Sequence, residues 1–190
     1  MARCNEYSLL LLSGGKSTRM GTDKASLTLD GKPFWAHMLD KARLLGLEQF
    51  YISGASPLSP DAKTVPDRYP DRGPLGGLHA GLLSAKTPYC LVLPVDAPTV
   101  PGNILEALIA HHEQSPDKNK VLIWEHGDRQ EPLIAIYPAA MAQTIEDLIR
   151  EKSAPVFRAL DRWGYESLRL ETDEAQILNI NTPELYEKIK

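Results

Sequence analysis

The apolar residues of this chain gather in short continuous runs. Residues 9–12 are four leucines, and residues 89–95 contain no charged residue and are apolar throughout. A run without polar alternation is typical of a strand that is buried on both faces, as in the parallel sheet of an α/β protein. Shorter apolar stretches at 50–53 and 63–65 predict two further strands. The pattern therefore predicts an α/β fold built on a mostly parallel sheet.

Helical periodicity fills the segments between these runs. In residues 34–45 the apolar side chains recur at helical spacing on one face, and Gly46 ends the helix. Further helices are predicted at residues 75–85, 101–114, 139–151 and 156–163. The first of these begins after Pro74 and contains several glycines, each of which costs about 1 kcal/mol against alanine in a helix interior. We therefore expect this helix to approach the sheet or a ligand closely.

The sequence of the second half of the chain predicts one strand that runs antiparallel to the others. Apolar runs at 120–125 and 132–137 are separated by a short segment that contains Gly127, which is typical of a β-hairpin. One strand of this hairpin would be antiparallel to an otherwise parallel sheet. Residues 168–170 predict an edge strand. A chain of 190 residues can bury one sizeable core, so we expect residues 1–190 to form a single domain.

Composition and charge exclude several classes of protein. The net charge of −4 gives no case for nucleic-acid binding, and no apolar stretch approaches the length of a membrane span. Only two cysteines are present, which favours a reducing compartment and predicts a cytoplasmic protein, with Cys90 packed as a small hydrophobe. His111 and His112 are adjacent on a predicted helix and cannot chelate a metal together, so we interpret them as surface residues.

The candidate chemistry begins where the first apolar run ends. Gly14 and Gly15 follow that run, and a polar loop with Lys16, Arg19 and Lys24 follows the glycines. Open α/β sheets bind ligands at the carboxyl ends of their strands. Paired glycines let backbone N–H groups approach an anion, and cations complement phosphates. We interpret this loop as a nucleoside triphosphate site.

Two better-known phosphate loops do not fit these residues. A P-loop that ends at Gly15, Lys16 and Ser17 requires a glycine at position 10, where the chain has Leu10. A dinucleotide motif requires spaced glycines, whereas Gly14 and Gly15 are adjacent. From the residues alone, the remaining alternative is a strand-to-loop turn with solvated basic side chains.

Polar residues also follow later apolar segments. Asp96 ends the run 89–95, where a carboxylate can bind Mg²⁺ for phosphates because Mg²⁺ prefers oxygen ligands. A turn or helix-cap aspartate is the alternative, but opposite a phosphate loop we favour the metal ligand. Asn179 and Asn181 alternate with apolar residues, so in an extended segment they point to the same side and suggest a shared ligand surface.

Five segments resemble, in the same order, the signature segments of the molybdenum cofactor guanylyltransferases, which are nucleotidyltransferases with a glycosyltransferase-like Rossmann fold. They are residues 12–24 (LSGGKSTRMGTDK), 73–78 (GPLGGL), 93–98 (LPVDAP), 131–133 (EPL) and 178–183 (LNINTP). The first segment is shared by many nucleotidyltransferases, and the last one narrows the family most. The resemblance implies a three-layer, Rossmann-like, mostly parallel sheet of the nucleotidyltransferase type, consistent with one antiparallel strand.

The resemblance also implies an activity and a set of site residues. The terminal phosphate of molybdopterin would attack the α-phosphate of GTP, release pyrophosphate and form the guanine dinucleotide cofactor, with Mg²⁺ as the metal. GTP and molybdopterin would be the substrates, and molybdenum-cofactor delivery proteins or acceptor enzymes the partners. The implied catalytic residues are Arg19, Lys24 and Asp96, with Asp96 as metal ligand, and the implied binding residues are Leu12, Ser13, Gly14, Gly15, Lys24, Asp67, Asp96, Asn179 and Asn181.

Other functions stay open at this point. A related branch uses CTP, a sugar-phosphate nucleotidyltransferase shares the first loop, and a non-catalytic carrier would bind a nucleotide or cofactor without turnover. Lys24 and Asp96 together argue against the carrier, because it needs neither. The chain departs from the family at Ser13, where alanine is usual, and after the strand 50–53, where an asparagine is often found.

Overall fold

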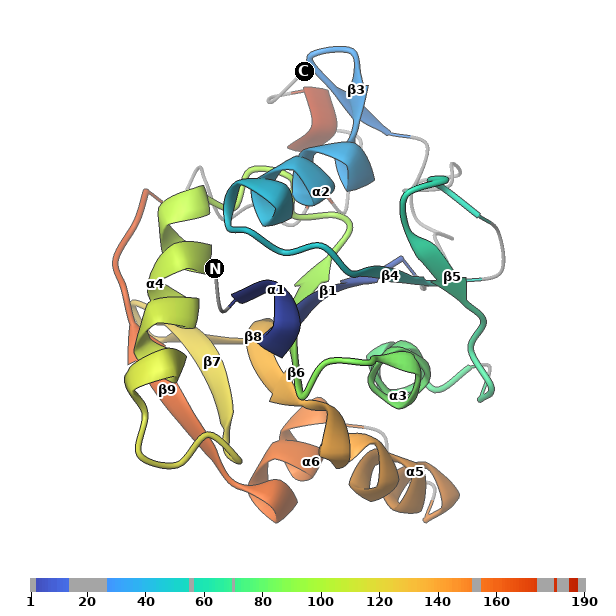
Figure 1. Ribbon diagram of the computed structural model, residues 1–190, viewed down its shortest axis with the longest axis vertical. Helices are drawn as coiled ribbons and strands as arrows, with labels where there is room; N and C mark the ends of the chain where they lie inside the picture. Colours follow the sequence, from blue (N-terminus) through green and yellow to red (C-terminus); the bar gives the residue numbers. More distant parts are fainter. Residues whose placement is uncertain are drawn as a thin grey trace.

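The computed structural model of the protein describes residues 3–13, 27–54, 57–69, 71–151, 155–173, 180 and 185–187 (Figure 1). The strands are β1 (Tyr7–Leu12), β2 (Thr28–Leu29), β3 (Lys32–Pro33), β4 (Phe50–Ser53), β5 (Lys63–Val65), β6 (Tyr89–Pro94), β7 (Val121–His126), β8 (Arg129–Pro138) and β9 (Tyr165–Arg169). The helices are α1 (Arg3–Glu6), α2 (Phe34–Leu44), α3 (Pro74–Ser84), α4 (Gly102–Gln114), the 3-10 helix η2 (Ala139–Met141), α5 (Ala142–Arg150) and α6 (Val156–Trp163). The helices predicted within these residues all form.

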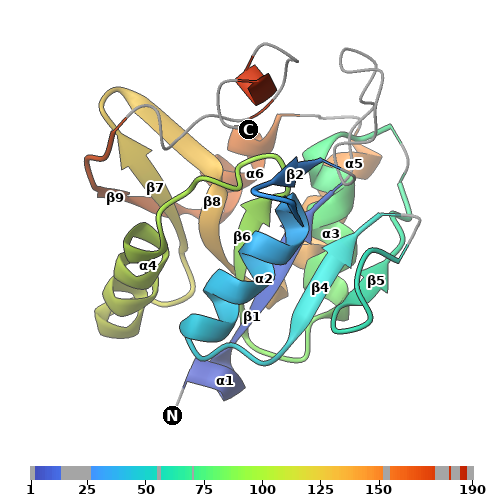
Figure 2. The same ribbon diagram turned by 90° about the horizontal axis from the view of Figure 1, so that it is seen from above.

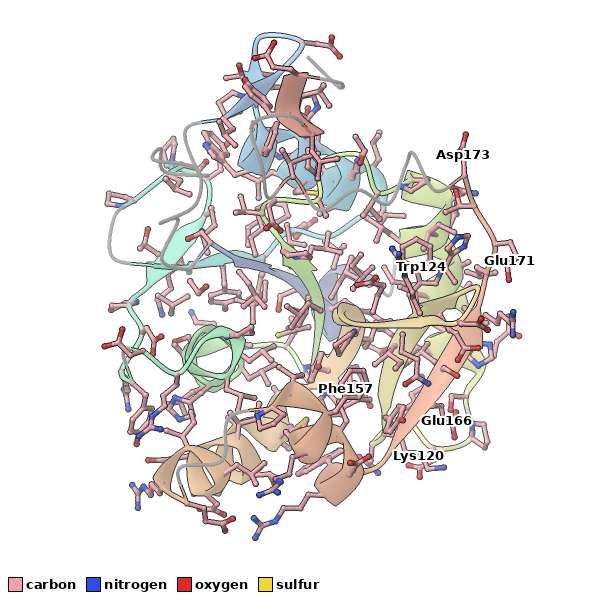
Figure 3. The ribbon with its side chains drawn as sticks, turned by 180° about the vertical axis from the view of Figure 1, so that it is seen from behind. Lys120, Trp124, Phe157, Glu166, Glu171 and Asp173 are labelled. Carbon is pink, nitrogen blue, oxygen red and sulfur yellow. The ribbon has the colours of Figure 1, made fainter. Side chains whose placement is uncertain are left out.

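Seven strands make one sheet in the order β5-β4-β1-β6-β8-β7-β9. The strand β8 pairs antiparallel with both β6 and β7, and every other pair in this sheet is parallel. The predicted hairpin and its single antiparallel strand are therefore confirmed. The strand β9 is the predicted edge strand, and the Lys120–Glu166 ion pair of 2.9 Å ties it to the start of β7 (Figure 3). The strands β2 and β3 form a separate two-stranded ribbon.

Helices cover both faces of the sheet and give the predicted three layers. The helices α2 and α4 lie on one face, and α3, α5 and α6 lie on the other (Figure 1). No helix among the described residues has both the length and the apolar character needed to cross a membrane.

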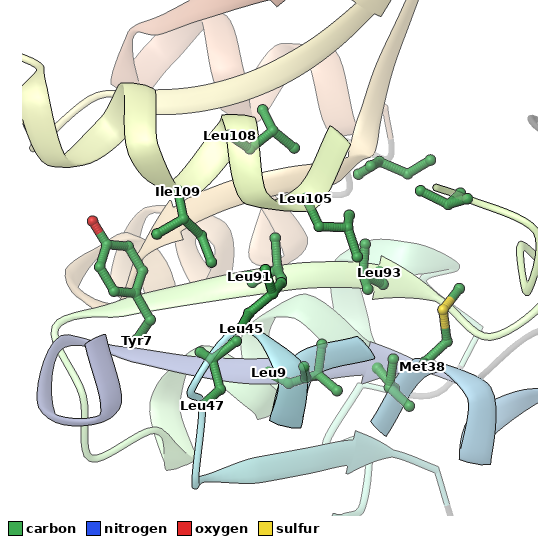
Figure 4. Packing of buried hydrophobic residues seen from close by; sticks show 14 of the residues in the cluster. Tyr7, Leu9, Met38, Leu45, Leu47, Leu91, Leu93, Leu105, Leu108 and Ile109 are labelled. Carbon is green, nitrogen blue, oxygen red and sulfur yellow. The ribbon is translucent and has the colours of Figure 1, made fainter. Parts of the chain in front are cut away.

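The four-leucine run explains why β1 lies between two helix layers. Leu9 and Leu11 face the core shared with α2 and α4, whereas Leu10 and Leu12 face the core shared with α3. Figure 4 shows the first of these cores, where Leu9 packs with Met38 of α2 and with residues of β6 and α4. Because successive strand side chains point to opposite faces, a strand covered on both sides has no polar alternation.

The helix α3 approaches the sheet as its small residues predict. A Cβ atom added to Gly81 would lie 2.3 Å from Leu10 Cδ1, and one added to Gly77 would lie 2.8 Å from Ser53 Oγ. Pro74 is the first residue of the helix. The glycines therefore lower the intrinsic stability of the helix and allow it to contact β1 and β4 closely.

The interpretation of His112 as a surface residue is wrong, although His111 is exposed as expected. His112 follows Leu108 by one helical turn on the buried face of α4 and is only 1% exposed. Its Nδ1 atom lies 2.7 Å from the Tyr7 hydroxyl. The prediction about Cys90 is confirmed, since its side chain is fully buried and burial raises the pKa of the thiol to about 12.

We expect Gly81→Ala to destabilise the protein. Alanine favours the helix by about 1 kcal/mol, but its methyl group would overlap the side chain of Leu10, which is fully buried. Overpacking of this kind costs about 1–3 kcal/mol, so the free energy of unfolding in urea should fall. Gly102→Ala, at the start of α4 with open space around it, is the control and should not destabilise. Equal effects of the two substitutions would contradict close packing at Gly81.

Candidate active site

The carboxyl ends of β1, β4, β5 and β6 lie along one edge of the sheet, because these strands are parallel neighbours (Figure 2). Leu12, the last residue of β1, pairs with Ser53 of β4 on one side and with Pro94 of β6 on the other. The predicted phosphate loop leaves the sheet at Ser13, so it begins between the ends of two neighbouring strands. This is the place where open α/β sheets bind ligands.

Two serines fix the start of that loop. The Ser13 backbone N–H donates to Ser53 Oγ at 3.3 Å, and the Ser13 hydroxyl donates to the Ser53 carbonyl. Ser53 is 1% exposed, because Gly77 of α3 packs directly against it. The sequence motifs predict no role for Ser53. Its position as the last residue of a strand beside β1 is the signal that could have identified it.

Asp67 lies over the first turn of α3. It follows β5, and its Oδ1 atom accepts a hydrogen bond of 2.7 Å from the Tyr69 backbone N–H. A Cβ atom added to Gly76 would lie only 2.2 Å from Asp67 Oδ2. Gly76 therefore leaves the space that the Asp67 carboxylate occupies, and the partly exposed carboxylate remains accessible at the sheet edge.

The loop that carries Asp67 is anchored to α5 by a hydrogen bond between residues that were not predicted from the sequence. The Tyr69 hydroxyl donates a hydrogen bond of 2.6 Å to Glu146, which also accepts one of 2.6 Å from Arg150. These hydrogen bonds, that of Tyr69 foremost, lower the pKa of Glu146. The Tyr69 ring meets His79 edge to face at 5.2 Å, and burial lowers the pKa of His79. Tyr69, His79 and Glu146 come from three separate elements, so no local pattern reveals the contacts among them.

Asp96 lies in the turn that follows β6, here called the Asp96 turn (residues 95–100). The Val95 N–H donates to the Leu12 carbonyl at 3.0 Å, which joins this turn to the end of β1. The Asp96 carbonyl accepts a hydrogen bond of 2.8 Å from the Ile180 N–H. The backbone of Asp96 is thus held between the start of the phosphate loop and the C-terminal segment.

A small apolar cluster brings three distant segments together beside the Asp96 turn. Leu27 and Phe34 flank the β2–β3 ribbon, Val95 precedes Asp96, and Ile180 comes from the C-terminal segment. Ile180 is fully buried, as expected for the apolar residue of an alternating stretch. Tyr186 also closes on the ribbon, and its hydroxyl donates to the Thr28 carbonyl at 2.9 Å.

The side chains around Asp96 fit a metal that arrives with phosphates better than a resident metal. Among the described residues there is no group of three or more His, Cys, Asp or Glu side chains that could hold an ion. Mg²⁺ is commonly bound by one or two carboxylates together with substrate phosphates and water. One carboxylate at the end of a central strand, beside a phosphate loop, satisfies that requirement.

The β7–β8 hairpin reaches the same edge of the sheet because β8 is antiparallel. Glu131 lies on β8 where the pairing register with β7 shifts, and burial raises the pKa of its carboxyl group. Phe157 of α6 is one of the exposed large apolar side chains (Figure 3). An open hollow beside the hairpin is lined by Glu125, Gly127, Asp128, Gln130, Phe157 and Arg169.

The structure places four of the site residues predicted from the sequence. Leu12, Ser13 and Asp96 are joined through the hydrogen bonds of Leu12 and Val95, and Asp67 lies at the same edge over α3. The other predicted site residues lie outside the described residues: Gly14, Gly15, Arg19, Lys24, Asn179 and Asn181. The roles of all these residues, described or not, stay predictions.

Comparison with known proteins agrees with this architecture. Residues 9–167 match the family described as "MobA-like NTP transferase domain". A "Molybdenum cofactor guanylyltransferase" from Pseudomonas aeruginosa is 32% identical over 189 residues, which cover 94% of this chain and 91% of the relative. A "Probable molybdenum cofactor guanylyltransferase" from Rhodopirellula baltica is 30% identical over 185 residues, covering 92% of this chain and 87% of the relative.

A solved structure from Archaeoglobus fulgidus, described as "Molybdopterin-guanine dinucleotide biosynthesis protein A", has the same fold. It aligns with a TM-score of 0.75 and 23% identity over 96% of both chains. The family match and the curated relatives define the chain as a nucleotidyltransferase. The chain belongs to the MobA-like NTP transferase family, which confirms the resemblance seen in the sequence.

We expect Tyr69→Phe to destabilise the protein at neutral pH and to have a smaller effect in acid. The folded-state pKa of Glu146 is lowered, so its stabilisation is complete above the unfolded-state pKa and is lost as pH falls through the folded-state value. Urea unfolding at about pH 7 and about pH 3 measures the difference. Tyr165→Phe is the control, because the Tyr165 hydroxyl contacts the amide of Gln130, which does not titrate. An effect of Tyr69→Phe that is equal at both pH values would contradict this role for Glu146.

Proposed function

We propose that this protein transfers GMP from GTP to the terminal phosphate of molybdopterin. A phosphate oxygen of molybdopterin attacks the α-phosphorus of GTP, the bond from that phosphorus to the bridging oxygen breaks, and pyrophosphate leaves with the electron pair. The observation that carries the proposal is the Val95–Leu12 hydrogen bond of 3.0 Å, which fixes the Asp96 turn beside the origin of the phosphate loop. The relatives at 30–32% identity, named molybdenum cofactor guanylyltransferases, support the choice of substrates.

Reactions of this class depend on alignment and charge stabilisation rather than on a protein nucleophile. The acceptor phosphate is already ionised near neutral pH, so the reaction needs no general base. We assign Arg19 and Lys24 to the triphosphate, where fixed cations stabilise the charge that develops on the leaving pyrophosphate. The backbone of Leu12, Ser13, Gly14 and Gly15 would contact the nucleotide, and Asp67 would contact it from above α3.

Asp96 is assigned as the protein ligand of a Mg²⁺ ion that enters with GTP. When bound, the ion would neutralise phosphate charge. The carboxylate is the part of this site that the chain supplies, and its position is set by β6 and by the backbone bonds of the Asp96 turn. Asn179 and Asn181 flank Ile180, whose N–H binds the Asp96 carbonyl, and this adjacency supports their assignment to the molybdopterin side.

Two of the rival functions, the CTP-dependent enzyme and the carrier, differ from the proposed function in nucleotide recognition and in turnover. A CTP-dependent enzyme would keep the same fold and phosphate loop and differ in its contacts to the base. A carrier would bind a nucleotide or molybdopterin without releasing pyrophosphate. As part of the proposed guanylyltransferase function, we also propose a cytoplasmic location. The partners would be delivery proteins or acceptor enzymes for the finished cofactor.

Pyrophosphate release with molybdopterin and each nucleoside triphosphate tests the function. We expect release with GTP and Mg²⁺ and only background release with ATP, CTP or UTP. Release with CTP alone would transfer the assignment to the cytidylyltransferase branch. No release with any nucleotide, together with measurable nucleotide binding, would support the carrier and overturn the proposal.

We expect Asp96→Ala to lower the turnover rate by about 10²-fold or more, the effect of removing one preorganised charge stabiliser. The thermal unfolding midpoint should stay close to that of the parent protein, because the bonds that hold the turn come from its backbone. Asp161→Ala, on the exposed face of α6, is the matched control and should retain full activity. Undiminished Mg²⁺-dependent turnover in Asp96→Ala would remove Asp96 from the site.

A further inference from the structure

A lysine of α2 contacts the turn that carries Asp96. Lys41 is near the end of the helix, and its Nζ atom donates hydrogen bonds of 2.5 Å to the Pro98 carbonyl and 2.7 Å to the Val100 carbonyl. Both acceptors are backbone atoms of the Asp96 turn, and both residues are buried. One side chain therefore joins two points of the segment that follows Asp96.

The surroundings of Lys41 set it apart from the surface lysines nearby. Among the described residues, no carboxylate forms an ion pair with its ammonium group, whereas Lys32 pairs with Asp40. Burial of the Lys41 side chain lowers the pKa of its ammonium group to about 8. An ammonium group that loses water without gaining a counter-charge is costly, and hydrogen bonds from a charged donor to backbone carbonyls offset that cost.

The backbone hydrogen bonds within the Asp96 turn are long. Ala97 N–H donates to Pro94 O and Val100 N–H to Ala97 O, each at 3.3 Å, which is long for such bonds. The turn has no helix or strand structure of its own between Pro94 and Gly102. The shorter bonds from Lys41 of α2 reach the turn at Pro98 and at Val100.

We propose that Lys41 is a positioning residue, whose ammonium group fixes the Asp96 turn and so orients the Asp96 carboxylate toward the metal of the metal–GTP complex. This inference rests on the proposed function, which supplies the metal and the nucleotide. Lys41 acts through the backbone of residues 98–100 and does not touch the reacting atoms. Groups that orient a metal ligand in this way contribute about 10–100-fold to metal affinity.

The test compares Lys41→Met with Lys32→Met. Methionine removes the ammonium group and keeps an unbranched side chain, and Lys32 provides a surface control on the adjoining ribbon. Mn²⁺ serves as the probe with a non-hydrolysable GTP analogue, and binding to the protein is measured as the loss of the free-ion EPR signal beyond that in the same mixture without protein. We expect Lys41→Met to raise the dissociation constant for Mn²⁺ by about 10-fold or more, and Lys32→Met to leave it unchanged.

Two further measurements separate positioning from general stability. The affinity for the GTP analogue without metal should be the same in Lys41→Met and in the parent protein. Lower thermal stability with unchanged Mn²⁺ affinity would overturn the proposal, because it would give Lys41 a purely structural role. If Lys41→Met does not fold, Lys41→Gln, which lacks the charge, is measured in its place under the same criteria.

Asp96→Ala in the same Mn²⁺ titration distinguishes failure of this inference from failure of the proposed function. If Asp96→Ala abolishes the nucleotide-dependent binding and Lys41→Met does not weaken it, only the role of Lys41 is wrong. If Asp96→Ala binds Mn²⁺ as the parent protein does, the assigned metal ligand is wrong, and the role of Lys41 falls with it.

Discussion

The burial of β1 between two helix layers is the constraint on which the rest of the structure depends. Its successive leucines face the two cores in turn, so that each core receives two of the four. The strands β4 and β6 complete the hydrogen bonding of β1 on its two edges. The carbonyl of its last residue, Leu12, then accepts the N–H of Val95. The strand that organises the hydrophobic core therefore also sets the spacing between the phosphate loop and Asp96. A shift of β1 along its axis would disturb both.

The pattern of apolar residues was enough to predict the seven strands of the main sheet and the helices that cover it, because each depends on local periodicity and on burial of one or both faces. It did not predict α1 or the β2–β3 ribbon. The pairing of β8 followed from a short hairpin connection. His112 was interpreted as a surface residue together with His111, because adjacent histidines cannot chelate one metal. One position on the helix separates the buried face with His112 from the exposed face with His111. Periodicity with Leu108 would have given the right answer.

For the candidate site, some residues were predicted from the sequence and others were not. Leu12, Ser13, Asp67 and Asp96 were predicted through strand ends and through resemblance, and the structure shows that each lies at the carboxyl edge, whereas their roles stay predictions. Tyr69, Glu146 and Lys41 were not found, since each acts through a partner on another element. Contacts between segments far apart in sequence leave no periodic signal. Their detection requires the fold. In this fold, α5 holds the loop that carries Asp67, and α2 holds the Asp96 turn.

The return of the C-terminal segment to the β2–β3 ribbon has a consequence for the order of folding. The hydrogen bonds between Tyr186 and Thr28 join residues 158 positions apart, and Ile180 closes on Asp96 in the same region. Closing so long a loop costs conformational entropy, so contacts of this kind form late relative to local ones. The β1–β4–β6 core lacks this requirement. The β1–β4–β6 core can therefore assemble before residue 180 reaches the Asp96 turn, whereas the contacts around Asp96 are completed only afterwards. The folding chain passes through a state with a formed core and an incomplete Asp96 region.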